Sequence, residues 1–226
     1  MAATIQKNTL EFLSSLKEYN SREWFAEHKP AYEAARKDFI LFLEELLENM
    51  QVFEPIAYGQ QGKDLVFRIY RDVRFSHDKR PYKDHFGAFI AEGGRKSTKP
   101  GYYLHLAANN QSFVAGGLWM PPAEDLKAVR QEIDYNLDTF KGIVESIDFK
   151  KHFPELSGEQ LKTTPKGYDK DNPAITYLRF KSWNAVKMLT DQEVLSSNFM
   201  DTVLDAFRTV KPLNDFLLQP LLDIGE

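Results

Sequence analysis

The sequence predicts an α+β fold, in which an antiparallel or mixed central sheet is packed by N-terminal and C-terminal helices in a single domain. Three observations lead to this prediction. Apolar residues recur at helical spacing in the first third of the chain and again after Pro121-Pro122, whereas the middle third alternates with the period of a strand. Glycine and asparagine pairs interrupt the alternating region, as in hairpins. The chain has no internal repeat, so one domain over residues 1–226 is expected.

The N-terminal region, residues 8–50, is expected to be helical. A leucine recurs every three residues from Leu10 to Leu16, which places these side chains on one helix face. Ser21 is a capping residue for a second helix. Pro30 suits the first turn of a third helix, because the N–H that proline lacks would have no partner there.

Alternating apolar and polar residues define the candidate strands and make the region 60–120 rich in sheet. Gly93-Gly94 and Asn109-Asn110 lie between successive candidates and suit the positive φ angles of hairpin turns. The candidate strands are residues 65–75, 86–91, 101–108, 111–119 and 175–182.

The C-terminal half is expected to be mainly helical. A helix over 122–146 begins after two prolines and carries one apolar stripe. Further helices are expected over 191–222, with a short last helix from Val210. Thr190 and Glu193 have the spacing of a capping box at the start of this region.

Composition excludes several classes of function. The chain has no cysteine, which excludes disulfides, thiolate metal sites and cysteine nucleophiles, and it has no secretory signal or long apolar run, so a cytoplasmic location is expected. The net charge of −4 argues against a dedicated nucleic-acid binder. Residues 63–96 nevertheless contain nine Lys or Arg and five Asp or Glu, which makes this segment basic within an acidic chain.

The run VFRIYRDVRF, residues 66–75, has two different faces if it is a strand. Phe67, Ile69, Val73 and Phe75 would face the core, and the opposite face would present two arginines with a tyrosine between them. Guanidinium forks match the geometry of phosphate and carboxylate groups.

Further basic and aromatic residues follow in the loop 76–85 and in two later candidate strands, GYYLHL and TYLRFKSW. Polar loops after strands commonly hold binding groups, and cations beside aromatic rings suit phosphate-bearing ligands. The candidate ligand-binding residues are Arg68, Tyr70, Arg74, His77, Asp78, Lys79, Tyr82, Lys83, His85, Tyr103, His105, Arg179 and Lys181.

These residues support a domain that recognises an anion or phosphate, with three other interpretations. The arginines could instead form structural ion pairs with acids of covering helices, such as Glu44, Glu48 and Glu132. General acid-base groups near the arginines could make the protein an enzyme acting on an anionic substrate. The same face could also bind an acidic protein.

No metal site and no cofactor is predicted. The five histidines lack the HExxH spacing, and His77, Asp78, His85 and His105 would have to converge in space to hold a metal. No GxGxxG or GxxxxGK[ST] loop is present to hold the phosphates of a nucleotide. Gly116-Gly117 is better interpreted as a bulge or bend in a strand.

Five runs occur along the chain in this order: NSREWFAEHKPAYE, FRIYRDVRFSHDKRPYKDHFGAFI, GYYLHL, SFVAGGLWMPP and PKGYDKDNPAITYLRFKSW. Taken together, they resemble the uncharacterised bacterial family called domain of unknown function 2461. The similarity extends from about Leu10 to Leu218, and the pattern RIYRDVRFS-DK-PYK is its most specific part. The resemblance implies a one-domain bacterial protein and adds no activity, cofactor or catalytic residue.

Overall fold

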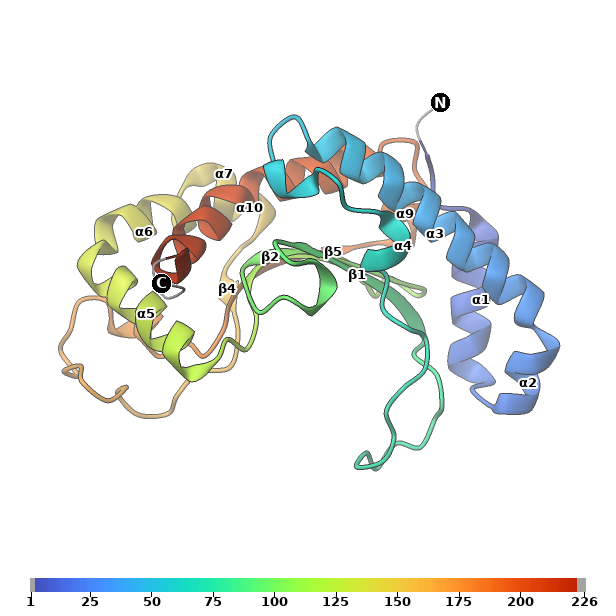
Figure 1. The fold of residues 1–226 in the computed structure, drawn as a ribbon, viewed down its shortest axis with the longest axis horizontal. Helices are drawn as coiled ribbons and strands as arrows, with labels where there is room; N and C mark the ends of the chain where they lie inside the picture. Colours follow the sequence, from blue (N-terminus) through green and yellow to red (C-terminus); the bar gives the residue numbers. More distant parts are fainter. Residues whose placement is uncertain (1–2, 223–226) are drawn as a thin grey trace. The chain divides into compact units, whose positions relative to one another are not determined.

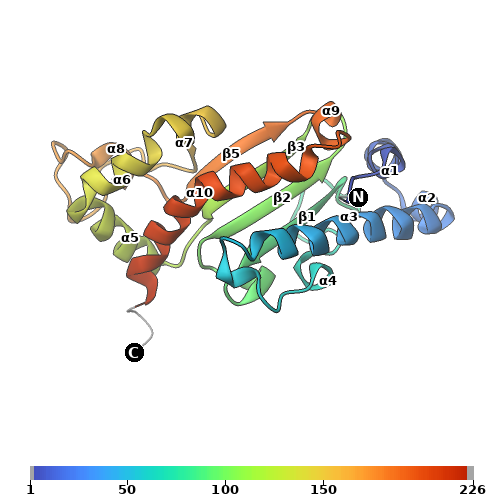
Figure 2. The same cartoon turned by 90° about the horizontal axis from the view of Figure 1, so that it is seen from above.

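The computed structural model describes residues 3–222 and has an open, antiparallel five-stranded sheet combined with helices, which confirms the predicted α+β class. The strand order is β1-β2-β3-β5-β4, so β5 lies between β3 and β4. Figures 1 and 2 show the elements with their labels. The strands are β1 (His85–Ala91), β2 (Gly101–Ala107), β3 (Ser112–Leu118), β4 (Leu156–Ser157) and β5 (Trp183–Leu189).

Helices occupy both ends of the chain, as the helical spacing predicts. Ser21 caps α2, because its hydroxyl oxygen accepts a hydrogen bond from the Trp24 backbone N–H at 3.1 Å. Pro30 lies in the first turn of α3. The helices of the described residues are α1 (Lys7–Glu18), α2 (Arg22–Glu27), α3 (Lys29–Met50), α4 (Gly62–Leu65), α5 (Ala123–Tyr135), α6 (Leu137–Val144), α7 (Ile147–His152), α8 (Ile175–Leu178), α9 (Asp191–Val194) and α10 (Phe199–Leu222), with the 3₁₀ helices η1 (Pro55–Ala57) and η2 (Gly94–Lys96).

The chain forms two compact units. The first contains the described residues up to 95, together with 103–114 and 188–205, and the second contains 96–102, 115–187 and the described residues from 206. Strands β2, β3 and β5 each contribute residues to both units. The number of folding domains stays a prediction.

The core of the first unit lies between α3 and one face of β1, and Figure 2 shows α3 running beside that strand. The ring centroids of Phe39 in α3 and Phe86 in β1 are 5.7 Å apart. Phe42 stacks on Phe199 at 4.9 Å, and both rings are buried. This packing buries one face of the β1 strand and leaves the other face for half-buried polar and aromatic side chains.

In the second unit, two glycines of β3 permit close packing. A Cβ atom on Gly117, whose φ is +130°, would lie 2.0 Å from the carbonyl oxygen of Trp183. A Cβ on Gly116 would lie 2.5 Å from the Val210 side chain. The Gly116-Gly117 pair therefore lets β3 approach its neighbours within the chain.

Residues 175–182 do not form the predicted strand. They begin with the helical turn α8, and the strand β5 starts only at Trp183. The side-chain oxygen of Asn172 accepts a hydrogen bond from Ala174 N at 2.7 Å, and Pro173 follows the asparagine directly. Asparagine followed by proline favours the start of a helix, and this signal outweighs the alternation in TYLRFKSW.

The C-terminal helices also differ from prediction. The expected helix over 122–146 is divided into α5 and α6 at Asn136. The Thr190–Glu193 capping box is present, but it caps the one-turn helix α9 rather than a long helix. Helix α10 then continues without a break through Val210. Among residues 3–222, no helix is long and apolar enough to cross a membrane.

Candidate functional site

Residues 66–84 form an arm that leaves the edge of the sheet and returns to it, in place of the predicted strand 65–75. Isolated bridges pair Val66 with Ala88 and Tyr70 with Tyr82. Figure 1 shows the arm as a narrow loop extending away from β1. The alternation in VFRIYRDVRF therefore describes one side of a two-stranded projection, which pairs with β1 at Val66 and with its own returning segment at Tyr70.

The root of the arm is fixed by the turn between α1 and α2. The Asn20 amide donates to the Tyr82 carbonyl oxygen at 3.1 Å and accepts from the Tyr82 N–H at 3.0 Å. Phe25 stacks on the Tyr82 ring at 4.0 Å, and the Tyr70 ring lies 5.3 Å from Tyr82. Tyr82 is buried by these contacts. It positions the arm, and its role in ligand binding stays a prediction.

The outer part of the arm is held by ion pairs among its own residues. Asp78 contacts Arg71 at 2.7 Å and Arg80 at 2.8 Å. Asp72 accepts from Arg74 at 2.7 Å. Hydrogen bonds from Arg80, followed by those from Arg71, lower the pKa of the Asp78 carboxyl. These arginines therefore form structural ion pairs, which was one of the alternatives left open by the sequence. Their partners are acids of the arm itself rather than acids of covering helices.

The tip of the arm carries two more of the predicted residues, His77 and Lys79. Lys79 donates to the Val73 carbonyl oxygen at 3.0 Å, and His77 is exposed. Phe75, which was expected to face the core, is 95% exposed. The tip is therefore a loop closed by its own hydrogen bond, and it carries one exposed aromatic ring.

Three rings stack across the neighbouring strands β1, β2 and β3 on the face opposite the core. His85 stacks on His105 at 4.1 Å, and His105 stacks on Phe113 at 4.4 Å. We call these three residues the ring ladder. Tyr103 adjoins it, because its hydroxyl lies 3.2 Å from His105 Nδ1. A Cβ at Gly87 would lie 2.4 Å from that hydroxyl, so glycine is needed for the tyrosine to lie across β1.

Burial controls the protonation of the ladder. It lowers the pKa of His105 to about 3, with a further contribution from His85, and it also lowers the pKa of His85. Both rings are therefore neutral near pH 7. His85 Nδ1 donates to Asp84 Oδ1 at 3.4 Å, because a carboxylate can only accept. Burial raises the pKa of Tyr103 to about 12, so its hydroxyl stays protonated.

Two cations at the arm root make no ion pair within the described residues, although the charge of Arg68 adds to the hydrogen bonds from Arg74 that lower the pKa of Asp72. The Lys83 ammonium lies 5.4 Å from the centroid of the Phe67 ring, and the Arg68 guanidinium is exposed. Within residues 3–222, neither cation makes an ion pair or a side-chain hydrogen bond. Burial and then the charge of Arg68 lower the pKa of Lys83. We call Arg68 and Lys83 the cation pair.

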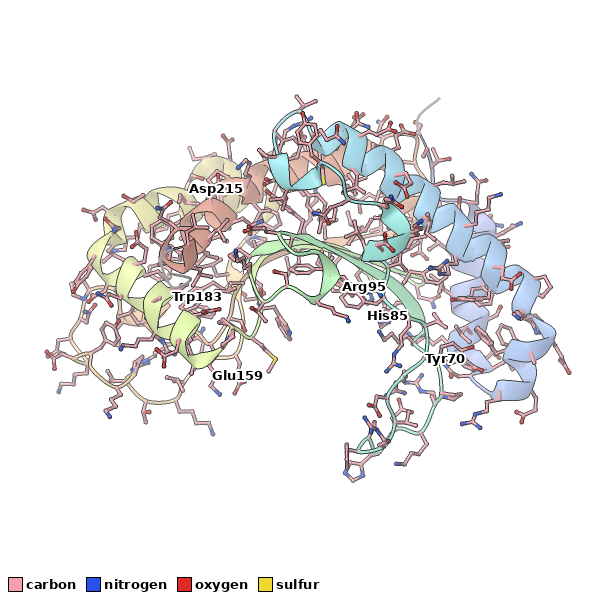
Figure 3. The ribbon with its side chains drawn as sticks, viewed as in Figure 1. Tyr70, His85, Arg95, Glu159, Trp183 and Asp215 are labelled. Atoms are coloured by element: carbon pink, nitrogen blue, oxygen red, sulfur yellow. The ribbon has the colours of Figure 1, made fainter. Side chains whose placement is uncertain are left out.

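The structure therefore brings together only part of the predicted site. Lys83, His85, Tyr103 and His105 share one face at the arm root, as Figure 3 illustrates for His85. Arg179 and Lys181 belong to the second unit, where Lys181 contacts Glu159 at 2.5 Å. The third basic-aromatic strand expected around them is absent, because that segment begins as α8.

Sequence reasoning did not identify three residues that shape this site. Phe67 was assigned to the core face, although it lies under Lys83. Phe113 completes the ring ladder, and Gly87 makes room for Tyr103. A glycine in the middle of the apolar strand HFGAFI is the signal that could have indicated a close approach.

No group of three or more metal-ligating side chains gathers within residues 3–222. His85 and His105 are adjacent, but their rings stack face to face rather than directing nitrogens at a common point.

Comparison with protein families identifies one match. The model of a family described as "Conserved hypothetical protein (DUF2461)" matches residues 8–216. Comparisons with the curated proteins and with the solved structures found no match.

Proposed function

The chain belongs to the DUF2461 family of conserved hypothetical proteins, and we propose that its arm root binds an anionic ligand between Arg68 and Lys83. The ligand group is a phosphate or a carboxylate, since both present oxygens that match guanidinium and ammonium donors. The proposal concerns the first unit only.

The cation pair is the observation that carries the proposal. Like charges that are close enough to lower a pKa destabilise each other, and a half-buried ammonium also loses solvation. An anion between them would remove both costs. The other arginines of the arm, Arg71, Arg74 and Arg80, already contact carboxylates and gain less from a ligand.

The acid that follows Lys83 in the sequence contacts other residues. Asp84 accepts from His85 and lies 3.9 Å from Arg80, so its charge is directed to other partners. Protonation of His85 at low pH would add a third positive charge beside Lys83. Anion affinity is therefore expected to rise as the pH falls through the lowered pKa of His85.

The test is thermal unfolding with inorganic phosphate, sulfate, acetate and citrate. A bound anion at 100 times its dissociation constant adds about 2.7 kcal/mol of apparent stability, which raises the Tm of a chain of this size by roughly 5–11 °C. Arg68→Ala and Lys83→Met should abolish the shift. The matched control is Lys37→Met, which removes an exposed lysine on α3 and should retain it.

Lys83→Met distinguishes a binding role from a structural one. If Lys83 serves a ligand, removing its repelled charge leaves the Tm of the free protein equal or higher, while the anion-induced shift disappears. A lower Tm in the free variant together with an intact anion shift would contradict the proposal. So would the absence of any shift in the wild-type protein.

An acid-base enzyme is a second candidate, favoured by the bond between Asp84 and His85. Because His85 Nδ1 carries the proton donated to Asp84, the neutral ring has an unprotonated Nε2 that could act as a general base. Hydrolysis of p-nitrophenyl phosphate or acetate tests this candidate. His85→Gln should remove turnover while retaining anion binding, and unchanged turnover would exclude His85 as the base.

We also propose, from composition, that the protein is cytoplasmic and is not a dedicated nucleic-acid binder. The exposed Phe75 at the arm tip supports a contact with an acidic protein partner as a lesser alternative. Fractionation of the native host and a pull-down with Phe75→Ser as the control would test these proposals.

A further inference from the structure

We infer that the ligand at the cation pair carries a planar ring next to its anionic group and has the size of a mononucleotide. This inference rests on the proposed function and names the ligand class of that site. It is carried by an array of side-chain rings that begins directly at Lys83 and continues across the sheet.

The ring array links the cations to the ladder. Lys83 lies over Phe67, and the Phe67 ring centroid is 6.4 Å from that of Tyr103. Tyr103 in turn lies 5.6 Å from Phe113 and 6.0 Å from His105. All of these rings are half-buried rather than enclosed, so part of each meets solvent.

A ligand anchored by its anion at Lys83 therefore places its next group beside aromatic rings. Planar rings gain free energy from stacking on such side chains, whereas a bare sugar or inorganic anion gains little there. The neighbouring Gly87 keeps this part of β1 free of its own side chain and lets the Tyr103 ring occupy the space. The array thus contributes a part of the binding free energy that depends on the ring of the ligand.

The charges limit the ligand to one or two anionic groups. His85 and His105 are neutral near pH 7, so the ladder adds no charge for further phosphates. The arginines of the arm beyond the root contact Asp72 and Asp78, and Lys79 donates to a backbone carbonyl. A long polyanion would have to break those pairs, so a mononucleotide or a similar ring phosphate fits better than an oligonucleotide.

The experiment measures four dissociation constants by isothermal titration. The probes are ribose 5-phosphate, adenosine monophosphate, adenosine and a short single-stranded oligonucleotide. Adenosine monophosphate should bind about tenfold tighter than ribose 5-phosphate, as expected for one stacked base. Adenosine should bind at least about tenfold weaker than its monophosphate, because it lacks the group that contacts the cation pair.

Variants separate the two parts of the site. Phe113→Leu should weaken adenosine monophosphate several-fold and leave ribose 5-phosphate unchanged. Phe67→Leu should weaken adenosine monophosphate more than ribose 5-phosphate, whereas Arg68→Ala should weaken both. Two ring variants are used so that the test remains possible if one of them does not fold. Tyr58→Leu, which removes an exposed ring after η1, is the matched control and should bind like the wild type.

The outcomes distinguish the inference from the proposed function. Equal binding of adenosine monophosphate and ribose 5-phosphate would overturn the inference and leave anion binding standing. No binding of any phosphate would overturn both. Affinity that rises with each added nucleotide, or adenosine that binds as tightly as its monophosphate, would also overturn the inference. A ligand-dependent shift of the His85 and His105 C2 proton resonances would support it, since these rings belong to the array.

Discussion

Replacing His105 by phenylalanine should make the folded protein less sensitive to acid. The ring of His105 lies between His85 and Phe113, and its pKa in the folded state is about 3. In the unfolded chain a histidine has a pKa of about 6.5. Between these two values the unfolded chain binds a proton that the folded protein does not bind.

The sign of the effect follows from this difference. Because the folded pKa is lowered, the contribution of His105 is fully present above about pH 6.5 and is lost as the pH falls toward 3. Between about pH 7 and pH 5, one such histidine removes about 2 kcal/mol from the free energy of unfolding. For a chain of this length, that lowers the Tm by roughly 4–8 °C.

The assay is thermal unfolding from pH 7 to pH 5 of the wild type, His105→Phe and His77→Phe. The phenylalanine keeps a ring in the ladder, so His105→Phe should lose clearly less stability over this range than the wild type. His77→Phe removes an exposed histidine at the arm tip and keeps the ladder, so it should follow the wild type. Parallel losses in the wild type and His105→Phe would show that acid does not act through His105.

Three further substitutions test how the site is supported. Asn20→Ala leaves the buried backbone groups of Tyr82 without their partner, so we expect a loss of about 2 kcal/mol in urea unfolding, and an unchanged midpoint would refute the clamp. Gly87→Ala places a Cβ 2.4 Å from the Tyr103 hydroxyl and should cost about 1–3 kcal/mol, with partial recovery in Gly87→Ala/Tyr103→Phe; equal loss in both would argue against this clash. Asp78→Ala should leave the Tm near that of the wild type, because exposed ion pairs contribute little to stability, while amide hydrogen exchange in the arm becomes faster. Unchanged exchange would mean that the ion pairs of Asp78 do not order the arm.

Local patterns predicted the elements whose signals lie within a few residues. Ser21 caps a helix and Thr190 forms a capping box, as their spacing indicates. Asn109 and Asn110 have the positive φ values of a hairpin turn between β2 and β3. The two-residue period of a strand also placed Tyr103 and His105 on one face of β2, because side chains alternate along any strand.

The same reasoning misplaced elements where two local signals competed. Alternation predicted a strand at 175–182, but Asn172-Pro173 starts a helical turn there. Alternation also assigned Phe75 to a core face, although an alternating segment is buried only if the fold supplies something to cover it. The run VFRIYRDVRF does not indicate whether another element of the fold packs against it.

The sequence by itself determined the α+β class, the basic character of the arm and the face shared by Tyr103 and His105, because these follow from period, composition and parity. Only the tertiary structure decided which cations are free. Arg71 and Arg74 are paired within the arm, whereas Arg68 and Lys83 are not paired within residues 3–222. Residue type alone does not show which charges pair, because ion pairing also depends on the distances between side chains. A candidate anion site therefore becomes visible only in the folded arm.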